Sequence, residues 1–168
     1  MAKNQVIMAW SRCKIEIGTM PVAETMASSL SEIGVIKDKS TTLTPEDGDV
    51  LEAKQTGGIL VAREQQDGAY TLATRVIEPT AELLTTLGIG KAGSEATANE
   101  TLVTTHIVDK YFSVKLTPKN SGAKGIKAPK CSVAFKPGYS EEEGNYADIE
   151  FSILNGDAGY WYSIYTVE

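Results

Sequence analysis

Hydrophobic and polar residues alternate with a period of two along much of the chain, which is the pattern of β-strands buried on one face. Near the amino terminus, Cys13, Ile15 and Ile17 alternate with Lys14 and Glu16. The alternation recurs at 70–77, 107–117, 131–135 and 149–153. Two further short strands are expected at 33–37 and 40–44. The pattern therefore predicts a mainly β fold.

Residues 49–77 predict three consecutive antiparallel strands. A first strand at 50–55 ends at Gly57-Gly58, and an apolar run follows at once at 59–63. Paired glycines between two such runs are typical of a hairpin turn. Asp67-Gly68 is a second turn signal, before the strand at 70–77. The whole segment is interpreted as a three-stranded meander.

One helix is expected at about residues 79–87. Pro79 suits the first helical position, where its missing N–H group would have no partner. Leu83 and Leu87 fall on one face, and Gly88 can adopt the left-handed conformation that ends a helix. So short a helix is marginal alone, and we expect its leucines to dock on the sheet.

The remaining segments are expected to be loops or short hairpins. Gly, Ala, Ser and Thr dominate 88–104, and Lys and Gly dominate 118–129, so both are interpreted as long loops. An acidic turn is expected at 137–144, and a carboxyl-terminal hairpin pairs 149–153 with 160–167. Residues 18–32 fit either a short helix or an extended arm.

The element order, strands with one helix among them, predicts a single domain over 1–168. The fold class is a β-sandwich or barrel with one short flanking α-helix and long loops. The candidate assembly arm or loop at 18–32 belongs to this domain.

Composition narrows the function classes. The chain has 168 residues, of which 42% are hydrophobic and 23% charged, and a net charge of −6. This is a globular composition, and its acidity disfavours general nucleic-acid binding. No apolar run approaches the ~18 residues of a membrane span. The first residues carry no secretory signal, so the expected compartment is the cytoplasm.

The chemistry-bearing residues form no recognisable catalytic or metal-binding pattern. His106 is the single histidine, and it has no nucleophile motif beside it. Cys13 and Cys131 are interpreted as structural thiols. The glycine pattern at 88–93 follows a helix, whereas a dinucleotide site needs a strand there. Residues 46–49 are acidic but lack calcium-loop spacing. We expect no enzyme activity, cofactor or metal.

Charge and aromatic residues are unevenly distributed. Residues 110–136 hold seven lysines and no carboxylate, whereas 137–168 hold seven carboxylates and no base. These are either solvated loops or complementary rims that steer self-association. Trp161 and Tyr165 share one face near the carboxyl terminus, and Tyr160 and Tyr162 share the other. Such a strand is central in a sandwich, covered by a partner, or a platform that stacks on sugars.

The order and spacing of elements over residues 12–90 resemble a known family. The segments concerned are Ile15-Glu16-Ile17-Gly18, residues 32–40, Lys54-Gln55-Thr56-Gly57-Gly58, and the Leu-Leu-x-x-Leu-Gly helix at 83–88. Together they look like the tail tube (major tail) proteins of long-tailed bacteriophages and prophages.

The resemblance implies a structural subunit without catalytic residues. Members of the family are β-sandwiches or barrels flanked by a helix, and they form hexameric rings that stack into a tube for DNA. The implied partners are further copies, other tail proteins and DNA passing without specific binding, with no membrane. The implied location is the virion tail, after assembly in the host bacterial cytoplasm.

The family's assembly contacts use long loops and extended arms, which correspond by region to 18–32, 88–104 and 117–130. The candidate interface residues within them are Met20, Val22, Met26, Lys91, Lys124 and Lys127. An acidic lumen would repel phosphate, so the net charge is compatible with a DNA conduit. Two other hypotheses remain open: a β-sandwich module binding carbohydrate or another ligand through Trp161 and the tyrosines, and a small hydrolase around His106.

Overall fold

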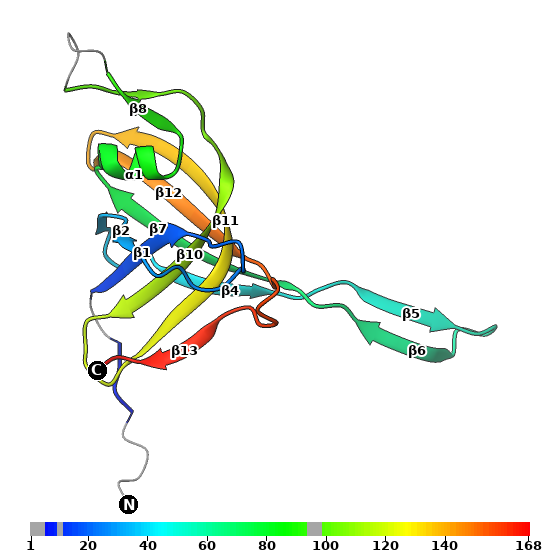
Figure 1. Cartoon of the computed structure of the whole chain (residues 1–168). Helices are drawn as coiled ribbons and strands as arrows, with labels where there is room; N and C mark the ends of the chain where they lie inside the picture. Colours follow the sequence, from blue (N-terminus) through cyan, green and yellow to red (C-terminus); the bar gives the residue numbers. More distant parts are fainter. Residues whose placement is uncertain (1–5, 10–11, 94–98) are drawn as a thin grey trace, which may run out of the picture.

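A computed structural model describes residues 6–9, 12–93 and 99–168, and it shows a mainly β architecture (Figure 1). Thirteen strands and one helix occur in this part of the chain. The first seven strands are β1 (Cys13–Thr19), β2 (Ser31–Glu32), β3 (Val35–Ile36), β4 (Thr42–Glu46), β5 (Val50–Lys54), β6 (Leu60–Gln65) and β7 (Ala69–Ile77). After them come α1 (Ala81–Thr86), β8 (Gly90–Ala92), β9 (Thr101–Val103), β10 (Ile107–Pro118), β11 (Lys124–Ser140), β12 (Gly144–Ile153) and β13 (Ser163–Thr166).

Nine of these strands form one curled antiparallel sheet. Its order is β2-β1-β10-β11-β12-β7-β3, with β13 beside β11 and β4 beside β7. The long strand β11 is central to it. Along one edge β11 pairs with β10, and along the other it pairs first with β13 and then with β12. The mainly β fold class is therefore confirmed.

One short segment joins the two ends of this sheet. β2 pairs with β1 and β3 pairs with β7, yet only Ile33 and Gly34 separate β2 from β3. The Ile33 N–H group donates to the Ile15 carbonyl oxygen at 3.0 Å, and its side chain is fully buried. The chain thus bridges the first and last strands, and the curled sheet becomes barrel-like.

Side chains link the same two edges further along. The Cys13 thiol lies 3.6 Å from the Thr41 hydroxyl, to which it donates. That hydroxyl lies 3.0 Å from the buried Thr74 hydroxyl of β7. Sequence reasoning treated Cys13 as a buried structural thiol, and it is half-buried at this seam.

The core fills the inside of the curled sheet. The alternating residues predicted from the sequence supply most of it, and the fully buried aromatic rings are Phe112 and Phe151. Cys131 is also fully buried there, and burial raises the pKa of its thiol to about 12. A thiol with so high a pKa is a poor nucleophile at neutral pH, which agrees with a structural role.

Helix α1 covers one end of the core, as predicted. Leu83 and Leu87 are almost fully buried. Gly88 has a φ of +77°, and its N–H group donates to the Thr85 carbonyl oxygen while the Ile89 N–H group donates to that of Leu84. This pair of bonds is the Schellman motif, and the left-handed conformation it needs favours glycine.

The beginning of the helix differs from the prediction. The cap is Thr80, whose side-chain oxygen accepts a hydrogen bond from the Leu83 N–H group at 3.2 Å. Pro79 therefore precedes the cap and is not the first helical residue. The threonine hydroxyl satisfies the Leu83 N–H group, one of the donors at the start of the helix that have no partner within it.

The predicted meander at 49–77 is wrong in one respect. β5 and β6 form the expected hairpin around Gly57-Gly58, but β6 does not pair with β7. The partner of β7 at that edge is β4, through the register Leu43↔Leu72. The two chain segments that form the β4–β7 pair continue outward as the β5–β6 hairpin, and all four strands make one long bent ribbon.

Two predicted loops contain strand. Residues 124–129 belong to β11, because Ile126 pairs with both Leu116 and Ile164. Lys and Gly there obscured the alternation. Residues 88–104 include the β8–β9 hairpin, and 94–98 within that prediction lie outside the described residues, as does the amino-terminal 1–5.

The carboxyl-terminal hairpin and the acidic turn also need correction. β13 pairs with β11 and not with β12. Residues 137–140 continue β11, so the turn is confined to 141–143. Residues 18–32 form no helix.

Replacing Leu83 by Asp tests the docking of α1. The substitution places a carboxylate without a partner in the core, and we expect the free energy of unfolding to fall by at least about 3 kcal/mol. Ala81→Asp is the matched control, because it puts the same charge on the exposed first turn, where the helix dipole favours it. Urea denaturation followed by circular dichroism measures both. Equal stability of the two variants would contradict the docking.

Candidate assembly interface

The feature that stands out from the barrel is the β5–β6 hairpin. Figure 1 shows it projecting far from the body of the molecule. We define the arm as residues 49–66. Every residue of β5 and β6 is exposed to solvent. The large apolar side chains on the arm, with exposed fractions between 41% and 64%, are Val50, Leu51, Ile59, Leu60 and Val61.

The two faces of the arm differ in character. Glu52 pairs across the hairpin with Arg63, and its carboxylate lies 3.6 Å from that guanidinium and 3.8 Å from the Lys54 ammonium. On the other face Leu51 pairs with Glu64, and Ala53 pairs with Ala62. A two-stranded hairpin is marginally stable by itself in water. Its unpaired edges and apolar side chains are therefore available to a partner.

The arm joins the barrel at a tight crossing of two chain segments. A Cβ atom on Gly68 would lie 1.5 Å from the Glu46 carbonyl oxygen, and one on Gly48 would lie 2.1 Å from that of Gln66. Only glycine permits this approach. Across the joint, the Gln66 N–H group donates to the Asp49 carbonyl oxygen at 2.8 Å. Backbone contacts thus fix the direction in which the arm leaves the sheet.

The segment predicted as an arm, 18–32, instead lies along β10 and β11. The Ala27 N–H group donates to the buried Ser113 hydroxyl at 3.0 Å, and that hydroxyl donates to the Pro129 carbonyl oxygen at 2.8 Å. The Glu24 carboxylate accepts from the Lys130 ammonium at 2.6 Å. These contacts anchor the segment to the barrel.

The Glu24–Lys130 pair also holds the loop before β13. The second oxygen of Glu24 accepts from the Asp157 N–H group at 2.6 Å. The hydrogen bond from Lys130, and then that from Asp157, lower the pKa of Glu24. The same ion pair raises the pKa of Lys130, which also lies 4.9 Å from the centre of the Tyr111 ring.

The structure does not bring the six candidate residues together. Met20 and Met26 are half-buried in the anchored segment, whereas Val22 is fully exposed. Lys91 lies in β8, at the end of the barrel opposite the start of β11, which holds the other two lysines (Figure 1). An interface role for them remains a prediction.

The two lysines in β11 have neighbours within the chain. Lys124 donates to the Thr166 hydroxyl, and Lys127 lies 4.7 Å from the centre of the Tyr165 ring. The lysine-rich and acidic stretches of the sequence also meet inside one subunit. The ammonium of Lys136 in β11 lies 3.1 Å from the Glu150 carboxylate in β12.

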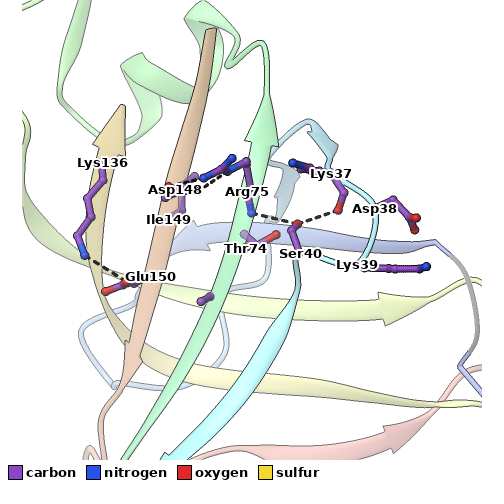
Figure 2. A pocket seen from close by; sticks show the side chains of 11 residues that line it. Lys37, Asp38, Lys39, Ser40, Thr74, Arg75, Lys136, Asp148, Ile149 and Glu150 are labelled. Carbon is purple, nitrogen blue, oxygen red and sulfur yellow. Dashed lines mark hydrogen bonds and ion pairs between the residues drawn. The ribbon is translucent and has the colours of Figure 1, made fainter. Parts of the chain in front are cut away.

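A shallow charged cavity of about 460 Å³ lies over β7, β11 and β12, bordered by residues 37–40 (Figure 2). Arg75 is at its centre. The guanidinium donates to both oxygens of Asp148, at 2.7 Å and 3.0 Å, and to Glu143 at 2.9 Å. It also stacks 4.2 Å above the centre of the Tyr146 ring. The Asp148 contact, above all, raises the pKa of Arg75.

This charged cluster is a structural link and not a free binding site. Lys37 pairs with Glu143, and its N–H group donates to the Arg75 carbonyl oxygen at 2.9 Å. The Ser40 hydroxyl accepts from the Arg75 N–H group at 3.2 Å (Figure 2). The network joins the β3–β4 connection and the 141–143 turn to β7.

The other residues considered from the sequence fall in separate places. His106 is exposed just before β10. The glycine pattern at 88–93 leads from the helix cap into β8, so no helix follows it. Trp161 and Tyr162 pack edge-on against Tyr70, with ring centres 5.6 Å and 5.2 Å apart. All three rings pack against the core cluster, and Tyr70 lies at the start of β7, just after the arm.

Sequence reasoning missed the arm, although the chain carries a signal for it. One strand of the ribbon is interrupted at 46–49 and the other at 64–68, and both interruptions are acidic and contain glycine. They lie opposite each other, because Glu46 pairs with Ala69. Matched breaks of this kind indicate that a hairpin leaves its sheet.

The chain matches no known family model and no curated protein sequence. Within the described residues, no helix has the length and hydropathy needed to cross a bilayer. In the same part of the chain, no group of three or more His, Cys, Asp or Glu side chains is arranged to hold a metal ion.

The Glu143 ion pairs make stability depend on pH in a defined direction. Lys37, and then Arg75, lower the pKa of Glu143 below its ordinary value of 4.5. This stabilisation is present above about pH 4.5 and is lost as pH falls through the folded-state pKa. When the pH is lowered from about 6 to about 3, we expect the free energy of unfolding to fall less in Glu143→Gln than in the wild type.

Urea denaturation at both pH values measures this difference. Glu141→Gln is the matched control, because Glu141 is exposed on the same turn and makes no ion pair with any described residue. A pH dependence altered equally by both substitutions would contradict the assignment.

Proposed function

We propose that this protein is a structural subunit of a phage or prophage tail tube, which self-assembles into stacked rings around a conduit for DNA. Its partners are further copies of the same chain and other tail proteins, and its place is the virion tail after assembly in the bacterial cytoplasm. The barrel with a flanking helix is compatible with this role, and the element order over 12–90 suggested it.

The observation that carries the proposal is the projecting arm. It offers five large apolar side chains to solvent on a hairpin that has no layer packed against it in the described residues. Covering such side chains contributes about 1–2 kcal/mol each. A subunit that buries its arm against a neighbour gains this energy, and the arm gains the support that an isolated hairpin lacks.

Open strand edges on the barrel supply a second kind of contact. Among the described strands, β13 pairs only with β11, and its Ile164 side chain is 65% exposed. Pairing between one subunit's edge and the next would continue the sheet between subunits. Such a contact is head-to-tail. It forms a ring when the rotation from each subunit to the next brings the last subunit back to the first.

The acidic balance supports a conduit more than a DNA-binding surface. The chain carries a net charge of −6, and a wall of that sign repels phosphate and lets DNA slide. The carbohydrate alternative has less support, because Trp161 and Tyr162 pack edge-on against Tyr70 and do not form a flat outward platform.

Removing the arm tests the proposal. Asp49 and Gln66 already face each other through a backbone hydrogen bond, so an Asn-Gly turn can replace residues 50–65. We expect this variant to keep the thermal stability of the barrel and to remain monomeric. The wild type should form rings or tubes, seen by negative-stain microscopy and sedimentation velocity.

A matched pair of point variants separates lost apolar surface from added charge. Val61→Asp and Thr56→Asp put the same charge on exposed positions of the arm, but only the first removes a large apolar side chain. Assembly should weaken more in Val61→Asp. A wild type that stays monomeric at high concentration would overturn the proposed function, whereas an arm-less variant that still forms rings would show that the arm does not carry the assembly.

A further inference from the structure

Charge is divided along the length of the arm. We define the arm tip as residues 52–63 and the arm root as residues 45–49 with 64–68, which includes the junction with the barrel. The tip carries Lys54 and Arg63 and the single carboxylate of Glu52, which pairs with Arg63 across the hairpin. The root carries no lysine or arginine, and its carboxylates belong to Glu46, Asp47, Asp49, Glu64 and Asp67. The arm is therefore basic and apolar at one end and strongly acidic at the other.

These charges are poorly compensated within one subunit. The two tip cations share the single carboxylate of Glu52, at 3.6 Å and 3.8 Å. Among the described residues, none of the root carboxylates forms an ion pair with a cation of this chain. Concentrated like charge at the root is repulsive, and an opposite charge brought there is attracted.

The root is also hollow. A cavity of about 350 Å³ lies among Glu46, Asp47, Gln66 and Asp67, and the rings of Tyr70 and Trp161 line it. Trp161 packs against the core cluster and edge-on against Tyr70, so this wall is rigid. The cavity thus combines aromatic surface with an acidic rim. The apolar tip residues Ile59, Leu60 and Val61 would fit the aromatic surface. Lys54 and Arg63, which flank them in the sequence, would fit the acidic rim.

The tip cannot occupy the root of its own subunit. Lys54 and its cross-strand partner Leu60 lie at the outer end of β5, whose five extended residues span about 17 Å from the root. Complementarity of charge and of apolar surface between the two ends of one repeated element favours another copy of the chain as the occupant.

We propose that the arm tip of one subunit docks in the root cavity of the next, with Lys54 and Arg63 facing Glu46 and Asp67. This contact rests on the proposed function and specifies which surfaces meet within the assembly. Tip and root are different surfaces, so the contact is head-to-tail and propagates until it closes. The cavity at each root receives one arm, and each subunit gives one.

Two charge-reversal variants test the contact. The tip variant is Lys54→Glu with Arg63→Glu, and the root variant is Glu46→Lys with Asp67→Lys. All four side chains are exposed, so we expect both variants to keep the wild-type circular dichroism spectrum and thermal midpoint. Each variant alone should need more than about tenfold higher concentration to assemble, because like charges meet at every contact.

The decisive measurement is made on a mixture of the two variants. Glutamates on one tip then meet lysines on the other root, and the unchanged tip and root meet as in the wild type. We expect the equimolar mixture to recover rings of alternating subunits, measured by sedimentation velocity and negative-stain microscopy. Damage to the arm itself would not be repaired by mixing, so recovery isolates the contact.

The other outcomes overturn the inference in distinguishable ways. Variants that assemble like the wild type, or a mixture that fails although both variants are folded, reject the tip-to-root contact while the proposed function stands. A mixture that stops at one-to-one dimers rejects the head-to-tail form, because it shows reciprocal pairing. A wild type that does not assemble rejects the proposed function and the contact together.

Discussion

The barrel depends on the closure that residues 31–36 make between its first and last strands. β2 pairs with β1, β3 pairs with β7, and the fully buried side chain of Ile33 lies between them. Without this bridge the curled sheet would leave open the edge of β1 and the end of β7 at Val76 and Ile77, with the core between them exposed. The Cys13–Thr41–Thr74 contacts reinforce the same seam, and the ion pairs of Lys37 and Arg75 with Glu143 hold the β3–β4 connection against β7.

The barrel-like wall also explains why the arm can project. β4 and β7 are held in the sheet wall, and their continuations have no further strand to pair with. The tight backbone crossing at Gly48 and Gly68 turns the ribbon outward. Rigid support at the root and apolar side chains toward the tip are what an element needs if it acts on a neighbouring molecule. The barrel fixes the direction of the arm, and the arm carries the exposed apolar side chains.

The sequence predicted what depends on local pattern and failed where pairing is distant. Alternation located the buried faces of β1, β7, β10, β11 and β12, and Gly88 with its leucines located the helix. Partner choice was missed, because an apolar run such as 59–63 looks the same whether a sheet covers it or solvent does. The lysine-rich start of β11 was missed since its burial comes from β10 and β13, which no local pattern shows. None of the six interface residues named from the sequence lies on the arm, whose exposure only the fold reveals.

The pairing of β1 with β10 has a consequence for synthesis on the ribosome. Cys13 faces Pro118, and Thr19 faces Phe112, so the amino-terminal strand has no partner on one side until β10 has been made. At about 5–20 residues per second the wait is roughly 5–20 s. During that time Ile15 and Ile17 are uncovered in the nascent chain, whereas β10, β11 and β12 meet their neighbours as soon as they emerge. The last part of the domain to be translated is thus the template on which the first part folds.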